Sequence, residues 1–152
     1  MDFNKKALGE EELKWFLEKM KLVEAFSILS DDELKELLSH MRGFEFKAGI
    51  TLVNQGEAAN LFFIVQTGEV EVLVQKFLFK KKKVAILKSG DFFGESVLVS
   101  NPKRSATVIT KTDTTCFVLL KPSFQTLLNQ VPLFKKLIKT TYSKRKAELK
   151  KV

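Results

Sequence analysis

The feature that most constrains the fold is a series of short apolar segments, separated by glycines, between Phe44 and Leu120. Each segment is three to seven residues long, too short for an independent helix and typical of a β-strand. The run from Gly68 to Val74 alternates polar and apolar residues, as a half-buried strand does. Glycine between segments permits the tight turns that join strands. The segments are 44–46, 50–53, 61–65, 70–74, 84–87, 106–109 and 114–120.

Helical patterns flank this region on both sides. Apolar residues recur at helical spacing from Glu10 to Phe26, and Ser30-Asp31-Asp32-Glu33 has the form of a capping box that opens a second helix. Helical periodicity returns at Lys121, and a last helix is expected from Leu133 to about Leu149, after a proline that suits a first turn. The predicted class is α+β, mainly β: an eight-stranded β-roll or jelly-roll barrel with N-terminal helices, a short helix inside the roll and C-terminal helices.

Length and composition predict one folded domain. The chain has 152 residues, of which 45% are hydrophobic and 29% charged, enough for a single sizeable core. We expect a single domain over 1–152, with helices in 1–42, the β-roll in 43–120 and helices in 121–152. No apolar run approaches the roughly 20 residues of a membrane span, and the N-terminus lacks the apolar stretch of a signal peptide. With a lone cysteine, Cys116, an internal disulfide framework is excluded, and a cytoplasmic location is expected.

Positive charge is concentrated at the C-terminus. The net charge is +8, and residues 131–152 hold eight basic residues and one acidic residue. The simpler interpretation is a solvated helix face. The alternative is a surface that contacts nucleic acid, an acidic protein or an anionic surface. Lys80 to Lys83, between two expected strands, is interpreted as a solvated hairpin tip, because four like charges cannot share a buried site.

One segment has the residues of an anion site. Gly94 allows the backbone to approach a ligand, and a short helix that starts near Glu95 would direct free N–H groups toward an anion. Nine residues later, Arg104 offers a planar guanidinium that can bind two phosphate oxygens. A carboxylate beside a phosphate would be repelled unless it accepts a hydrogen bond from a sugar hydroxyl. Glu95 and Arg104 together therefore favour a nucleotide; the simpler alternatives are two unrelated surface charges or a mutual salt bridge.

The stretch 93–107, FGESVLVSNPKRSAT, resembles the phosphate-binding cassette of cyclic nucleotide-binding domains. That pattern is F-G-E, two residues, L, a short loop, R, a small residue or threonine, and A. The residues that match it in type and order are Phe93, Gly94, Glu95, Leu98, Arg104, Ser105 and Ala106. The turns at 48–50 and 55–57 and the hairpin over 61–70 also resemble the family.

The resemblance implies a role for each matched residue. Glu95 would accept from the ribose 2′-hydroxyl, Arg104 would pair with the cyclic phosphate, and the backbone near Gly94, Ser96 and Val97 would hold phosphate and sugar. Val97 departs from the family, which usually has a small residue there. The ligand would be cAMP or cGMP, without a metal. The residue after the arginine, Ser105, favours cAMP, because members that prefer cGMP often carry threonine at this position.

We expect a stand-alone sensor rather than an enzyme. Neither a metal cluster nor a nucleophile–base pair is present in the sequence. The last helix would close over the base, with Leu137, Ile138 and Tyr142 packed on the purine. Its movement would signal to an effector protein in trans or through a homodimer. The alternative function is a ligand-free barrel that acts as an interaction module through its basic C-terminal helix, with nucleic acid the less favoured partner.

Overall fold

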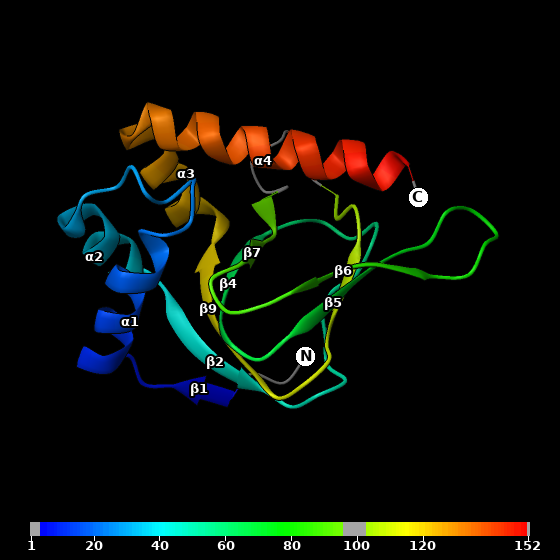
Figure 1. The fold of residues 1–152 in the computed structure, drawn as a ribbon, viewed down its shortest axis with the longest axis horizontal. Coiled ribbons are helices and arrows are strands. Elements are labelled where there is room, and N and C mark those ends of the chain that lie inside the picture. The colour runs from blue at the N-terminus through cyan, green and yellow to red at the C-terminus, as the bar shows by residue number, and fades with distance from the viewer. Residues whose placement is uncertain (1–3, 96–102, 152) are drawn as a thin grey trace.

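The computed structural model describes residues 4–95 and 103–151, which form two antiparallel sheets with helices packed at one end (Figure 1). The first sheet has the strand order β1-β2-β9-β4-β7, and the second has the order β3-β8-β5-β6. The first contains β1 (Asn4–Lys6), β2 (Arg42–Phe46), β4 (Leu61–Thr67), β7 (Phe92–Phe93) and β9 (Thr114–Leu120). The second contains β3 (Thr51–Val53), β5 (Val70–Val74), β6 (Lys82–Leu87) and β8 (Thr107–Thr110).

A small apolar core lies between the two sheets. Its centre is a stacked pair, Phe63 of β4 and Phe93 of β7, whose ring centroids are 4.5 Å apart. These rings face each other because the two residues are cross-strand partners in the antiparallel β4–β7 pair. Cys116 and Val118 of β9 join the same cluster. This core fixes the start of the expected cassette, whose first residue is Phe93.

A second, larger core joins the helices to the other face of the first sheet. It contains Phe62 of β4 and Phe117 of β9, which alternate with the residues that face the other sheet. Four helices cover it: α1 (Glu10–Met20), α2 (Asp31–Ser39), α3 (Lys121–Gln130) and α4 (Pro132–Lys150). The longest, α4, runs along the whole top of the molecule in Figure 1. Its first half packs on this core through Phe134 and Ile138.

Helix starts agree with the sequence better than helix ends. The capping box is confirmed, because Ser30 Oγ accepts from Glu33 N at 3.1 Å and Glu33 Oε1 accepts from Ser30 N at 2.9 Å. The first helix, however, ends at Met20 rather than Phe26. The chain then forms turns closed by hydrogen bonds such as that from Phe26 N to Val23 O. These turns direct Phe26 into the core, where it contacts Phe92 and Phe134.

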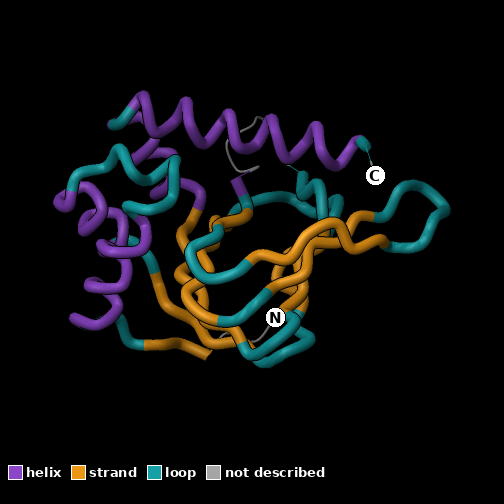
Figure 2. Tube along the Cα trace, in the orientation of Figure 1, coloured by secondary structure: helices purple, strands orange, loops and turns teal. Residues whose placement is uncertain are grey.

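The mixed helix and antiparallel-sheet class is confirmed, whereas the closed, eight-stranded barrel is not. The strands form two open sheets. Two strands were absent from the expectation: β1, which has no apolar alternation, and β7, which is only two residues long. The hairpin between β5 and β6 also differs, because its apex is Phe77 to Phe79, and Lys82 and Lys83 already belong to β6. Figure 2 shows this hairpin as a long loop that projects from the body of the molecule.

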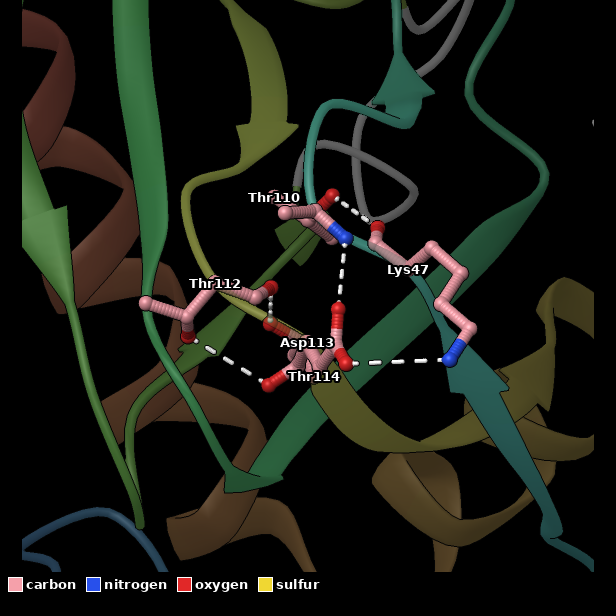
Figure 3. A network of polar contacts seen from close by, with 6 residues as sticks. Lys47, Thr110, Thr112, Asp113 and Thr114 are labelled. Carbon is pink, nitrogen blue, oxygen red and sulfur yellow. Dashed lines mark hydrogen bonds and ion pairs between the residues drawn. The ribbon is translucent and has the colours of Figure 1, made fainter.

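The turn between β8 and β9 is joined to the turn after β2 by polar contacts (Figure 3). Asp113 accepts from Ala48 N at 3.0 Å and lies 3.8 Å from Lys47 Nζ, while Thr110 Oγ1 donates to Lys47 O at 2.7 Å. Backbone groups at this end of the sheets are thereby paired without a covering helix. Within the described part of the chain, no helix is both long enough and apolar enough to span a membrane.

Candidate functional site

Gly94 allows the chain to turn tightly against β4 at the start of the site. Its φ is +92°, in the left-handed region that side chains disfavour. A Cβ at this position would lie 2.6 Å from Leu61 O and 2.9 Å from Arg104 Nη1. Glycine is therefore needed here both for the backbone conformation and for the space that the arginine occupies.

Arg104 is buried at the base of the site and fixed by its backbone. Its N–H donates to Glu57 O and its carbonyl accepts from Gly56 N, both at 2.8 Å, so the turn after β3 holds it in place. The residue is only 6% exposed, and its Nη2 donates to Leu61 O at 2.8 Å. Among the described residues, its buried Nη1 has no hydrogen-bond partner. Burial lowers the pKa of Arg104 to about 10, and the nearby charge of Glu95 opposes that change. The guanidinium therefore remains a cation at neutral pH.

Glu95 is equally buried, at 6% exposure, and its carboxylate pairs with a residue of α4. Arg145 Nη1 lies 3.0 Å from each carboxylate oxygen. The guanidinium of Arg145 also lies over the ring of Phe92, 4.8 Å from its centroid. Of the two simpler alternatives drawn from the sequence, surface charges and a mutual salt bridge, neither describes the pair, because both side chains are buried and the ion pair of Glu95 is made with Arg145.

A cavity of about 260 Å³ lies between the sheets and α4, with both charged residues in its wall. Expected site residues that line it are Phe93, Gly94, Glu95, Arg104, Ser105 and Ala106. Ser96 and Val97 lie outside the described residues, as does any helix beyond Glu95. The opposite wall is largely apolar and comes mainly from β3, β5, β6 and β8: Val53, Val72, Val84, Ala85, Leu87 and Val108. The cavity thus combines a charged end with apolar walls.

The expected lid is shifted along α4. Tyr142 lines the cavity, but Ile138 is fully buried in the helical core and Leu137 packs against that core. The expected register was wrong for these two residues because the first half of α4 covers the first sheet rather than the cavity. The cavity instead meets the second half of the helix through Tyr142, Arg145, Glu148 and Leu149.

Comparison with known proteins supplies the family. The model of the cyclic nucleotide-binding domain matches residues 44–131, from β2 to the end of α3. The chain belongs to this family. The cyclic nucleotide-binding domain described here is 35% identical over 105 residues to a cGMP-dependent protein kinase of Plasmodium berghei, a match that covers 69% of this chain and 12% of the kinase. It is also 35% identical over 112 residues to a cAMP-dependent protein kinase regulatory subunit of Yarrowia lipolytica, covering 74% of this chain and 29% of that subunit. The chain therefore spans less than a third of the length of either relative.

A solved structure supports the same fold. The domain superposes on a cyclic nucleotide-binding domain from Methylobacillus flagellatus with a TM-score of 0.80 and 20% identity, covering 99% of this chain and 88% of that one. At this identity the match establishes the fold alone. Among the described residues, no group of three or more His, Cys, Asp or Glu side chains is placed to hold a metal ion.

Sequence reasoning missed Arg145, which makes the ion pair with Glu95. It lies 50 residues after Glu95, outside any motif. A signal was nevertheless present, because Ile138, Tyr142, Arg145 and Leu149 follow helical spacing and share one face. A charged residue within an otherwise apolar stripe marks a polar partner on the surface that the helix covers.

Proposed function

We propose that the cavity binds cAMP and that the chain is a regulatory module that transmits occupancy of the cavity through α4. The observation that supports this most directly is the state of Arg104. Its side chain lines the cavity, and its Nη1 has no hydrogen-bond partner among the described residues. Burying a cation in this way costs folding free energy. An anionic ligand would offset that cost, and a cyclic phosphate supplies the oxygens that a guanidinium binds.

Glu95 supports a nucleotide rather than a free phosphate. Its carboxylate lines the same cavity as Arg104 and would repel a bare anion. A ribose hydroxyl attached to the phosphate would donate to it instead, so the two charged residues divide one ligand between them. The base would then lie along the apolar wall near Val72, Leu87 and Tyr142. A cavity of this mixed character is typical of small-molecule sites.

The choice of cAMP over cGMP is the finer part of the proposal. It depends on Ser105, which is exposed, lines the cavity and replaces the threonine that many cGMP-preferring members carry. Ser105→Thr is therefore expected to shift the ratio of cAMP to cGMP affinity toward cGMP. Isothermal titration of both nucleotides on the two proteins measures that ratio. An unchanged ratio would remove Ser105 as the basis of the preference.

Transmission would operate through the second half of α4, because that half touches the site. Arg145 binds the carboxylate that the ribose would share, and Tyr142 and Leu149 line the cavity. A ligand shifts a conformational equilibrium only when it contacts one conformer better than the other. These three residues supply that differential contact, so a nucleotide would alter how α4 lies on the cavity. An effector protein in trans would then recognise the changed helix.

Calorimetry and thermal shift with cAMP, cGMP and a cyclic dinucleotide test the proposal on the wild type, Arg104→Gln and Lys103→Gln. Lys103 is the matched control, because it is an exposed cation next in sequence and loses the same charge. A charge-assisted phosphate contact is worth roughly 1.5–3 kcal/mol, so Arg104→Gln should weaken binding about 10- to 150-fold. Lys103→Gln should leave it within about twofold. No stabilisation of the wild type by any nucleotide would refute the proposed ligand class, and equal affinity of the two variants would refute the role of Arg104.

A further inference from the structure

The hairpin between β5 and β6 ends in three consecutive exposed apolar side chains. Phe77, Leu78 and Phe79 are 88%, 85% and 75% exposed. Single exposed apolar residues are ordinary, but three large ones in a row at a projecting apex indicate a surface that binds a partner. They contribute nothing to either core, so the folding of the domain does not explain them.

The stem of the same hairpin is strongly basic. Residues 75–83 contain Lys76 and the run Lys80 to Lys83, and they contain no acidic residue. Lys80 to Lys83 are all exposed. At the rise of a strand, about 3.3 Å per residue, this run lies within about 13 Å of Phe79 along the chain. An apolar apex therefore precedes a belt of positive charge.

The hairpin is held in a defined direction at its base. Gln55 accepts from Gln75 N at 2.8 Å and donates to Gln75 O at 2.9 Å, and Lys76 Nζ donates to Lys150 O of α4 at 3.1 Å. At the apex, Phe79 N donates to Lys76 O at 3.0 Å, and Phe77 has a φ of +44°, uncommon for a bulky residue. In Figure 1 the loop extends away from the body of the molecule, beyond the end of α4. The apex is thus presented outward rather than folded back.

We infer that this hairpin docks the domain on an anionic phospholipid surface. Apolar side chains of interfacial segments enter the membrane by about 5–10 Å, and the projecting apex presents three such side chains. The lysines that follow would then lie at the level of the headgroups, where each lysine adds attraction to anionic lipid. The inference does not depend on the ligand of the cavity.

Shape and charge favour a bilayer over other partners. A second copy would bring two belts of five lysines together, and like charges repel. Single-stranded nucleic acid could stack on the phenylalanines, but it is held in basic grooves, whereas this apex is convex and has leucine at its centre. A fluid lipid surface accepts a projecting wedge without a complementary pocket.

Vesicle co-sedimentation tests the inference, with phosphatidylcholine alone and with about a third phosphatidylserine. The apex variant replaces Phe77, Leu78 and Phe79 with serine, and the stem variant is K80Q/K81Q. Leu22→Ser is the control for the apex, because Leu22 is 81% exposed elsewhere. K136Q/K139Q is the control for the stem, because it removes the same charge from two exposed positions of α4.

We expect the wild type to bind the anionic vesicles and not the neutral ones. The stem variant should lose affinity about 25-fold, at roughly fivefold for each lysine. The apex variant should lose more than about tenfold, and both controls should stay within about twofold. Because the changed residues are exposed, all variants should keep the wild-type melting temperature. Emission of Leu78→Trp should shift to the blue with anionic vesicles, whereas that of Leu22→Trp should not.

Three results would overturn the inference. The first is a wild type that does not bind anionic vesicles, and the second is binding that the α4 control abolishes and the apex variant retains. The third is evidence for another partner: an apex variant that changes the oligomeric state without lipid, or a single-stranded oligonucleotide that binds the hairpin more tightly than vesicles do.

Discussion

Arg104, the proposed phosphate-binding residue, works against the stability of its own fold. Its folded pKa, about 10, lies below that of an arginine in an unfolded chain. The unfolded state therefore binds more protons as the pH falls from above 12 to about 10, and the burial cost is present in full at every lower pH. At neutral pH the ligand-free domain carries that cost.

Arg104→Met should consequently raise the free energy of unfolding of the ligand-free protein, by about 1 kcal/mol, because an apolar side chain of similar length replaces a buried cation. Nucleotide binding should be lost in the same variant. Urea denaturation with and without cAMP measures both effects. A variant less stable than the wild type by more than about 1 kcal/mol would mean that the bond from Arg104 to Leu61 O outweighs the burial cost.

Cys116 gives an independent residue-scale prediction. Burial in the core between the sheets raises the pKa of its thiol to about 12. At pH 8 the thiolate fraction is then about a thousandfold below that of an exposed cysteine, and only the thiolate reacts. Native protein should therefore resist a thiol reagent until it unfolds, and raising the pH from 7 to 9 should not change this. Rapid modification at pH 8 in the absence of denaturant would contradict the burial of Cys116.

The sequence pointed to the two charged residues of the motif, but it did not show which residue would form an ion pair with Glu95. Residue type and spacing singled out Glu95 and Arg104 as candidate site residues, and the structure places both in the wall of one cavity. The partner of Glu95 depended on where α4 lies, a property of the whole molecule. A motif specifies local chemistry, whereas a contact across 50 residues depends on packing.

At the scale of elements, the sequence predicted where helices start and how their apolar residues repeat better than where the first helix ends. Capping side chains mark the start of α2, and prolines occupy the first turns of α3 and α4. The end of α1 carried no such signal, because apolar spacing continues through Val23 and Phe26. Phe26 nevertheless lies outside the helix and packs in the core against Phe134. Tertiary packing overrode a weak local preference there. Strand β7, two residues long, was below the length that periodicity can detect.

Two turn glycines allow two costs of substitution to be separated: the steric clash of an added Cβ and the strain of a positive φ. Gly94 and Gly56 have φ values of +92° and +86°, but a Cβ at Gly56 would meet nothing within 4 Å. Gly56→Ala should cost about 1–2 kcal/mol for the left-handed conformation alone. Gly94→Ala should cost at least about 1 kcal/mol more, and it should also weaken nucleotide binding, because its methyl group would displace Arg104 Nη1. Thermal melts and cAMP titration compare the two; equal losses of stability would show that the turn at Gly94 relaxes.

At the scale of the molecule, α4 connects three regions. Its first half is fixed in the helical core by Phe134 and Ile138, and Arg145 in its second half holds Glu95 in the cavity. Its last turn accepts the hydrogen bond from Lys76 at the base of the basic hairpin. Because buried side chains anchor the first half and a few polar contacts hold the second, a change at the cavity should move the second half while the first stays in place.

Arg145→Gln tests that division of the helix. The variant removes the ion pair with Glu95 and the contact over Phe92, and the partial exposure of Arg145 (31% for its side chain) limits the loss to about 1 kcal/mol. Amide exchange should accelerate roughly fivefold in the second half of α4, while the turns that contain Phe134 and Ile138 keep their protection. Lys144→Gln is the matched control, since it removes an adjacent exposed charge without touching the cavity. Exchange that rises equally along all of α4 would mean that the helix docks as a single unit, and a transmission confined to its second half would then be untenable.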